Sequence, residues 1–108
     1  MTDLNQLTLS EAREGLKSRK FSAEDLVKAC FERIETIDQK INSFVTLCEE
    51  EALKQAKSAD ISLPLGGIPI AVKDNYLTKD LRTTASSKLL DNYIAQYDST
   101  AVEKLKNA

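Results

Sequence analysis

Residues 66–75 read Gly-Gly-Ile-Pro-Ile-Ala-Val-Lys-Asp-Asn, and this stretch says most about the fold. Two glycines interrupt the chain, an apolar run follows from Ile68 to Val72, and Lys73 comes directly after it. A strand that is apolar on both faces is typical of the centre of a sheet covered by helices on both sides. We therefore expect an α/β fold in which this strand delivers Lys73 to the edge of the sheet, where such folds place their chemistry.

The pattern around Lys73 allows two interpretations. A lysine that is partly withdrawn from water can lose its proton and act as a base. Most lysines are exposed, however, and a solvated residue at a strand end has the same pattern. Asp74 and Asn75 are explained equally well by a turn or a hydrogen-bonding role. No helix signal follows Gly66 and Gly67 directly, so we interpret them as a flexible entrance to the strand and not as a phosphate-binding loop.

Capping signals predict two helices before this strand. Thr8 and Glu11 have the spacing of a capping box and begin the first helix, which Gly15 weakens by about 1 kcal/mol relative to alanine. Ser22, with Asp25 in the following turn, begins the second helix. Apolar residues recur along the second helix at steps of three and four and predict a broad buried face: Leu26, Cys30, Ile34, Ile37 and Ile41.

The rest of the chain gives weaker signals. The predicted elements are a short strand at 44–47, a third helix at 49–57, a turn capped by Ser86 or Ser87 that buries Leu89 and Leu90, and a last helix capped by Asp98 or Ser99. A central strand needs hydrogen-bonded neighbours on both edges, and only 44–47 is available as a second strand. We therefore expect the 108 residues to be the N-terminal piece of a larger protein.

The composition excludes several classes of site. The chain has 108 residues, a net charge of −2 and no histidine. This charge gives no electrostatic basis for direct nucleic-acid binding, and the missing histidines exclude a histidine base, a Cys-His pair and most zinc sites. We expect Cys30 and Cys48 to be reduced and mostly buried. No stretch approaches transmembrane length and no signal or transit peptide is evident, so a cytoplasmic location is expected.

The block at 66–75 resembles the amidase signature family, for which it is specific. The similarity continues through Thr78, 82–90 (Arg-Thr-Thr-Ala-Ser-Ser-Lys-Leu-Leu) and 97–102 (Tyr-Asp-Ser-Thr-Ala-Val). These blocks, together with 21–27 and 41–46 upstream, are most similar to one branch of the family, the A subunits of aspartyl/glutamyl-tRNA(Asn/Gln) amidotransferases. The resemblance covers essentially the whole chain.

This resemblance implies an amidase-signature fold, in which helices surround a large mixed sheet. Residues 1–108 would be the N-terminal segment of a single amidase domain. The segment would comprise N-terminal helices at 8–58, the first core strand with its lysine at 66–75, and a loop with the last helix at 76–108.

The resemblance also implies amide hydrolysis by a Ser-cisSer-Lys triad. In the family, one serine attacks the amide carbon, a second serine in a cis peptide relays the proton, and the lysine is the final base. Lys73 matches this lysine and is the one catalytic residue implied here; substrate-binding residues are not identified. Both family serines lie in a Gly/Ser-rich region further downstream. Ser86 and Ser87 lack flanking glycines, so we interpret them as cap or loop residues. The Thr83-Thr84 pair could line a substrate channel or belong to an ordinary polar loop.

The partners are also implied by the resemblance. A subunits of this branch release ammonia from glutamine and pass it to the B subunit, which activates mischarged Glu-tRNA(Gln) or Asp-tRNA(Asn) with ATP and magnesium. A small C subunit clamps the two together in a heterotrimer. We accordingly expect no cofactor or metal in this chain, ATP and magnesium in the partner subunit, tRNA contacts mainly on that partner, and no membrane association.

Three hypotheses therefore remain. The first is the glutamine-hydrolysing subunit of a tRNA-dependent amidotransferase, represented by its N-terminal segment, which would be inactive alone. The second is a free-standing amidase of the same family that acts on another small amide. The third is a non-catalytic fragment with a scaffold or binding role.

Overall fold

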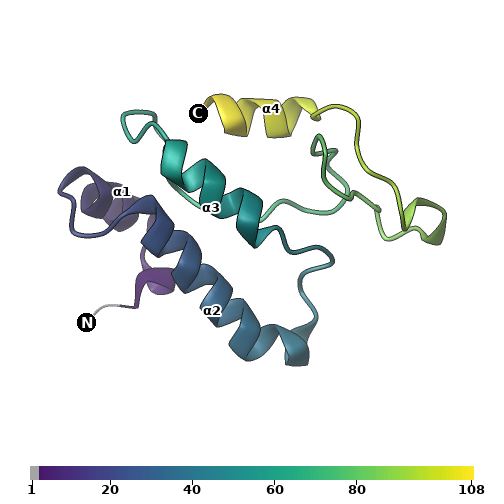
Figure 1. Cartoon of the computed structure of the whole chain (residues 1–108), viewed down its shortest axis with the longest axis horizontal. Coiled ribbons are helices and arrows are strands. Elements are labelled where there is room, and N and C mark those ends of the chain that lie inside the picture. Colours follow the sequence, from purple (N-terminus) through teal and green to yellow (C-terminus); the bar gives the residue numbers. More distant parts are fainter. Residues whose placement is uncertain (1–2) are drawn as a thin grey trace. The chain divides into compact units, whose positions relative to one another are not determined.

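A computed structural model describes residues 3–108, and helices are its main regular elements. The α-helices of this range are α1 (Leu9–Lys17), α2 (Ala23–Ile41), α3 (Glu49–Ser58) and α4 (Thr100–Asn107), with short 3₁₀ helices η1 (Leu4–Gln6) and η2 (Lys88–Leu90) (Figure 1). The chain forms two units, Met1–Pro69 and Ile70–Ala108. We call them the first and the second unit.

The predicted capping box at Thr8 is present in the first unit, and the predicted cap at Ser22 also forms a capping box. The Thr8 hydroxyl accepts a hydrogen bond from the Glu11 N–H at 3.2 Å, and the Glu11 carboxylate accepts one from the Thr8 N–H at 2.7 Å. Ser22 and Asp25 repeat the arrangement at the start of α2, at 3.1 Å and 2.9 Å. Each box satisfies N–H groups that have no partner inside the helix, so the predicted helix starts are confirmed.

The core of the first unit lies where α1 and the start of α2 meet. α3 packs against α2 and runs back along it (Figure 1). The core consists of small and medium apolar side chains, and larger ones pack around it. The buried set is Ala12, Leu16, Ala23 and Leu26, with Leu4, Leu7, Phe21, Ala56 and Ile68 packed against it.

The apolar face of α2 is buried only near its beginning. Leu26 and Val27 are buried, the next residues of the predicted face are half-buried, and Ile41 is 58% exposed. α2 ends at Asn42, whose left-handed φ of 54° turns the chain. The Asp38 carboxylate then accepts hydrogen bonds from the Ser43 N–H at 2.7 Å and the Phe44 N–H at 3.4 Å.

The predicted strand at 44–47 is absent from the structure. The Phe44 N–H donates to a side chain instead of a neighbouring strand, and Phe44, Val45 and Leu47 are exposed. Within residues 3–108 no strand runs beside this segment.

The apolar run at 68–72 does not form a strand either. Ile68 packs against the core of the first unit, whereas Ile70 and Val72 belong to the second unit and are 45% and 41% exposed. A central strand exists only where neighbours take its N–H and C=O groups and layers cover its faces. The described residues supply one isolated antiparallel bridge, between Arg82 and Ile94, so the expected sheet is not confirmed and the structure is mostly helical.

Gly66 and Gly67 are held closely, which differs from the flexible entrance expected at this position. A Cβ atom on Gly66 would lie 1.8 Å from the carbonyl oxygen of Asp60. Gly67 has a φ of +81° and would bring a Cβ atom to 3.1 Å from that of Ala23. Only glycine permits both the backbone approach and the left-handed conformation, so these residues fold the loop at 60–68 onto the first unit.

In the second unit, two extended segments pair side by side. The Asp80 N–H donates to the Ala95 carbonyl at 2.9 Å, and the Ala95 N–H donates to the Leu81 carbonyl at 3.0 Å. A third hydrogen bond joins the Thr83 N–H to the Tyr93 carbonyl at 3.0 Å. The side chains buried in this unit are few and small, namely Thr83, Thr84, Ala95 and Val102.

The turn between these segments contains η2 and points its leucines outward. Ser87 precedes η2, as predicted, but its side chain makes no capping hydrogen bond. The predicted burial of Leu89 and Leu90 is wrong, since they are 96% and 38% exposed.

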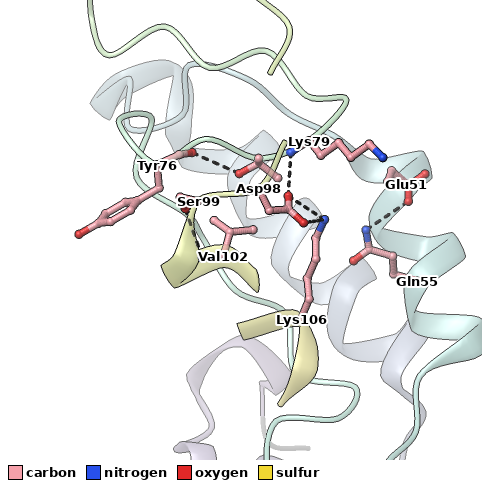
Figure 2. A network of polar contacts seen from close by, with 9 residues as sticks. Glu51, Gln55, Tyr76, Lys79, Asp98, Ser99, Val102 and Lys106 are labelled. Atoms are coloured by element: carbon pink, nitrogen blue, oxygen red, sulfur yellow. Dashed lines mark hydrogen bonds and ion pairs between the residues drawn. The ribbon is translucent and has the colours of Figure 1, made fainter. Parts of the chain in front are cut away.

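α4 is joined to the preceding loop by the carboxylate of Asp98. This carboxylate accepts a hydrogen bond from the Lys79 N–H at 2.8 Å and forms an ion pair with the Lys106 ammonium at 2.8 Å (Figure 2). Ser99 is the N-cap, and its hydroxyl accepts from the Val102 N–H at 3.3 Å. Of the two predicted caps, Ser99 is therefore correct. No helix in the described range is long and apolar enough to cross a membrane.

Gly15 is required by packing and not merely tolerated. A Cβ atom at this position would lie 2.1 Å from the Cζ atom of the Phe21 ring, which packs against the core. The glycine that lowers the intrinsic stability of α1 thus makes room for an aromatic side chain.

Gly15→Ala is therefore expected to destabilise the protein. Alanine gains about 1 kcal/mol of helix propensity, but displacing the ring costs about 1–3 kcal/mol. Urea unfolding should show a lower unfolding free energy, whereas the control Ser10→Ala, at an exposed position of α1, should show none of this loss. In a Phe21→Ala background the sign should reverse. If Gly15→Ala is more stable than the wild type while Phe21 is retained, the packing role of Gly15 is contradicted.

Candidate functional site

Lys73 lies in the second unit, four residues after the end of the first. Its side chain is exposed, and its ammonium has no hydrogen-bond or ion-pair partner among residues 3–108. Its carbonyl accepts a hydrogen bond from the Tyr76 N–H at 3.0 Å, which closes a tight turn over 73–76. The lysine side chain is exposed to solvent, while the hydrogen bond fixes the backbone of the turn.

Asp74 ties this turn to the middle of the second unit. One carboxylate oxygen accepts from the Thr84 N–H at 2.9 Å and the other from the Thr84 hydroxyl. The Asp74 carbonyl accepts from the Ala85 N–H at 2.8 Å. The hydrogen-bonding role predicted for Asp74 is confirmed. We call this set of three hydrogen bonds the Asp74–Thr84 clamp.

The electrostatics of the clamp favour the ionised carboxylate. Desolvation raises the pKa of Asp74, but the hydrogen bonds from the Thr84 hydroxyl and N–H oppose it. The Ser86 N–H and the positive charge of Arg82 act in the same direction as Thr84. Together they outweigh desolvation and hold the pKa of Asp74 below its ordinary value.

Thr83 and Thr84 are buried and line no channel in this structure. They are 5% and 4% exposed, and the Thr84 hydroxyl is already committed to Asp74. Thr84 was considered for a substrate channel, but its contact with Asp74, ten residues away, was not predicted. No local spacing rule joins residues that far apart in a loop, so a single sequence holds no signal for this contact.

Ser86 and Ser87 are loop residues, as interpreted from the sequence. The Ser86 N–H donates to the Thr84 hydroxyl at 3.3 Å, and the Ser87 N–H donates to the Thr84 carbonyl at 2.9 Å. Ala85 and Ser86 have φ values of 49° and 58°, a left-handed conformation that costs non-glycine residues free energy. Two such residues in succession make this a strained turn.

The two cysteines lie outside the Asp74–Thr84 clamp. Cys30 and Cys48 are free and half-buried. Burial raises the pKa of both thiols, and the charge of Glu51 raises that of Cys48 further. The predicted reduced state agrees with this arrangement, although burial is less complete than expected. Within residues 3–108 no three His, Cys, Asp or Glu side chains gather closely enough to hold a metal ion.

Comparison with known proteins places this chain among amidases. A family model described as Amidase matches residues 25–108. The A subunit of the glutamyl-tRNA(Gln) amidotransferase of Acinetobacter baumannii is 46% identical over 114 aligned residues, which cover 100% of this chain. Proteins of the same name from Dehalococcoides mccartyi and Carboxydothermus hydrogenoformans are 46% and 44% identical over 97% and 98% of it. In each case the chain spans 23% of the relative's length, and it matches an N-terminal segment.

The lowered pKa of Asp74 predicts an effect of pH on stability. A carboxylate with a lower pKa in the folded chain stabilises the fold when ionised. Its contribution is complete above the unfolded value, about 3.9, and is lost as the pH falls through the folded value. We expect Asp74→Asn to lower the unfolding free energy at pH 7 and to lower it much less at about pH 2.

Urea unfolding of wild-type and variant protein at several pH values measures this difference. Glu35→Gln is the control, because Glu35 is exposed on α2 and its carboxylate accepts no hydrogen bond from a described residue. A difference between Asp74→Asn and wild type that stays constant with pH would contradict an ionised clamp.

Proposed function

Because the chain belongs to the amidase family, we propose that the protein is the glutamine-hydrolysing subunit of a tRNA-dependent amidotransferase. The observation that carries this proposal is 44–46% identity, over nearly the whole chain, to proteins named as A subunits of glutamyl-tRNA(Gln) amidotransferase. The complete protein would convert Glu-tRNA(Gln), Asp-tRNA(Asn) or both by supplying ammonia. Glutamine is its proposed small-molecule substrate.

The proposed chemistry uses Lys73 as a base. A serine hydroxyl is a weak nucleophile until a neighbouring base takes its proton, and Ser-Lys pairs are one solution to this problem. The serine oxygen would bond to the amide carbon, the carbon–nitrogen bond would break, and ammonia would leave with the relayed proton. Water would then release glutamate. Both serines of the triad would come from outside residues 1–108.

The proposed assembly includes the B and C subunits in a cytoplasmic heterotrimer. The tRNA and the ATP and magnesium that activate it would be held mainly by the partner subunit, and this chain would hold no cofactor. We further propose that residues 68–72 become a core strand of one amidase domain in the complete protein. The exposure of Ile70 and Val72 supports this, because a core strand would bury both side chains.

The first test of this proposal is the substitution Lys73→Ala in the full-length protein. Loss of a general base typically costs about 10²–10⁴-fold in rate, so ammonia release from glutamine should fall by at least that range while the fold is kept. Lys104→Ala, at an exposed lysine of α4, is the matched control and should keep wild-type turnover. Near-normal turnover of Lys73→Ala would remove the lysine from the mechanism.

The second test is the response to the partner subunits. Glutamine hydrolysis by the full-length protein should rise when the B and C subunits are added, since an amidotransferase couples ammonia release to its use. The same turnover with and without partners would favour a free-standing amidase. A full-length protein that hydrolyses no amide would favour a non-catalytic role.

A further inference from the structure

The turn that carries Lys73 has few attachments to the rest of the second unit. Its internal hydrogen bond joins Tyr76 to Lys73 and holds only the turn itself. Outward from 73–76, the hydrogen bonds that reach a distant part of the unit are those of the Asp74–Thr84 clamp. The residue next to Lys73 therefore fixes the position of the turn.

Thr84 is a firm anchor for this clamp. It is 4% exposed and follows Thr83, whose N–H donates to the Tyr93 carbonyl in the paired segments. The strained residues Ala85 and Ser86 come directly after it. Strained backbone persists only where the surrounding structure determines it, and it concentrates at functional sites.

We propose that Asp74 and Thr84 are positioning residues for Lys73, and that the Thr84 hydroxyl acts on catalysis through the Asp74 carboxylate. This inference rests on the proposed function. A base must lie within about 2.6–3.2 Å of the proton it takes, and a misplacement of about 1 Å can cost on the order of 100-fold in rate. A lysine side chain has four flexible bonds, so a fixed backbone beneath it reduces the positions that its amine can reach.

Because Thr84 is buried, we expect it to position Lys73 and not to contact the substrate. Its hydroxyl donates to Asp74 and is closed off from solvent, so it has no free surface to offer glutamine. Loosening the clamp should accordingly slow the chemical step and leave substrate affinity alone. A threonine that bound substrate would affect KM instead.

The test compares Thr84→Val with Thr84→Ser in the full-length protein assembled with its partner subunits, with glutamine as substrate. Valine keeps the shape and removes the hydroxyl, whereas serine keeps the hydroxyl. We expect Thr84→Val to lower kcat at least tenfold with KM within twofold of wild type, and Thr84→Ser to stay within about threefold in kcat. Thr100→Val, at an exposed position of α4, is the matched control and should behave as wild type.

Hydrogen exchange gives a readout that does not depend on activity. In Thr84→Val the Ala85 and Tyr76 amides should exchange faster than in wild type, while the amides of α2 should not change. A wild-type kcat, unchanged exchange at these amides, or a raised KM with normal kcat would each overturn the positioning role. If wild-type protein hydrolyses no glutamine, the proposed function fails and exchange alone decides whether the clamp holds the turn.

Discussion

Backbone N–H and C=O groups that leave water need a partner, and this requirement shapes the whole chain. The helices meet it internally except at their ends, where side chains complete the pattern. In the loops, carboxylates accept hydrogen bonds from backbone N–H groups that a neighbouring strand would otherwise accept. The carboxylates that accept backbone N–H groups are spread from α1 to the start of α4: Glu11, Asp25, Asp38, Asp60, Asp74 and Asp98.

This use of carboxylates makes the fold sensitive to acid in a distributed way. Hydrogen bonds lower the pKa of Glu11, Asp25, Asp60 and Asp98, and they do so at Asp74 against desolvation. Each of these groups stabilises the fold when ionised and ceases to do so once it is protonated. The first unit also has an apolar core, whereas the buried side chains of the second unit are two threonines, an alanine and a valine. The second unit therefore depends more heavily on polar contacts.

Lys73, the residue to which we assign the proposed chemistry, lies in the second unit, which depends on polar contacts. Lys73 is exposed on its turn, and in the proposed mechanism residues from outside 1–108 would withdraw it from water. The clamp beneath it limits where the turn can lie. If Lys73 acts as proposed, stability and catalysis would be coupled at Asp74, because its carboxylate closes the loop and Asp74 is next to Lys73 in sequence. Like Asp74, the carboxylate of Asp98 joins two segments, the Lys79 backbone and Lys106 of α4 (Figure 2).

The sequence by itself determined the features that depend on near neighbours along the chain. The capping box at Thr8 and the cap at Ser22 involve residues three apart, so the sequence was enough to predict them. It also narrowed the cap of the last helix to Asp98 or Ser99, and the structure shows Ser99. The block around Lys73 likewise identified the family without a structure.

Only the tertiary structure decided the contacts that close loops, between residues six to ten positions apart. Three such contacts depend on how loops close. They are the Phe21 ring against Gly15, the Asp60 carbonyl against Gly66 and the Thr84 hydroxyl on Asp74. The apolar runs at 44–47 and 68–72 have the residue types of strands, yet they form none within the described residues. The physical reason is that a helix contains its own hydrogen-bond partners, while a strand exists only when another segment provides them.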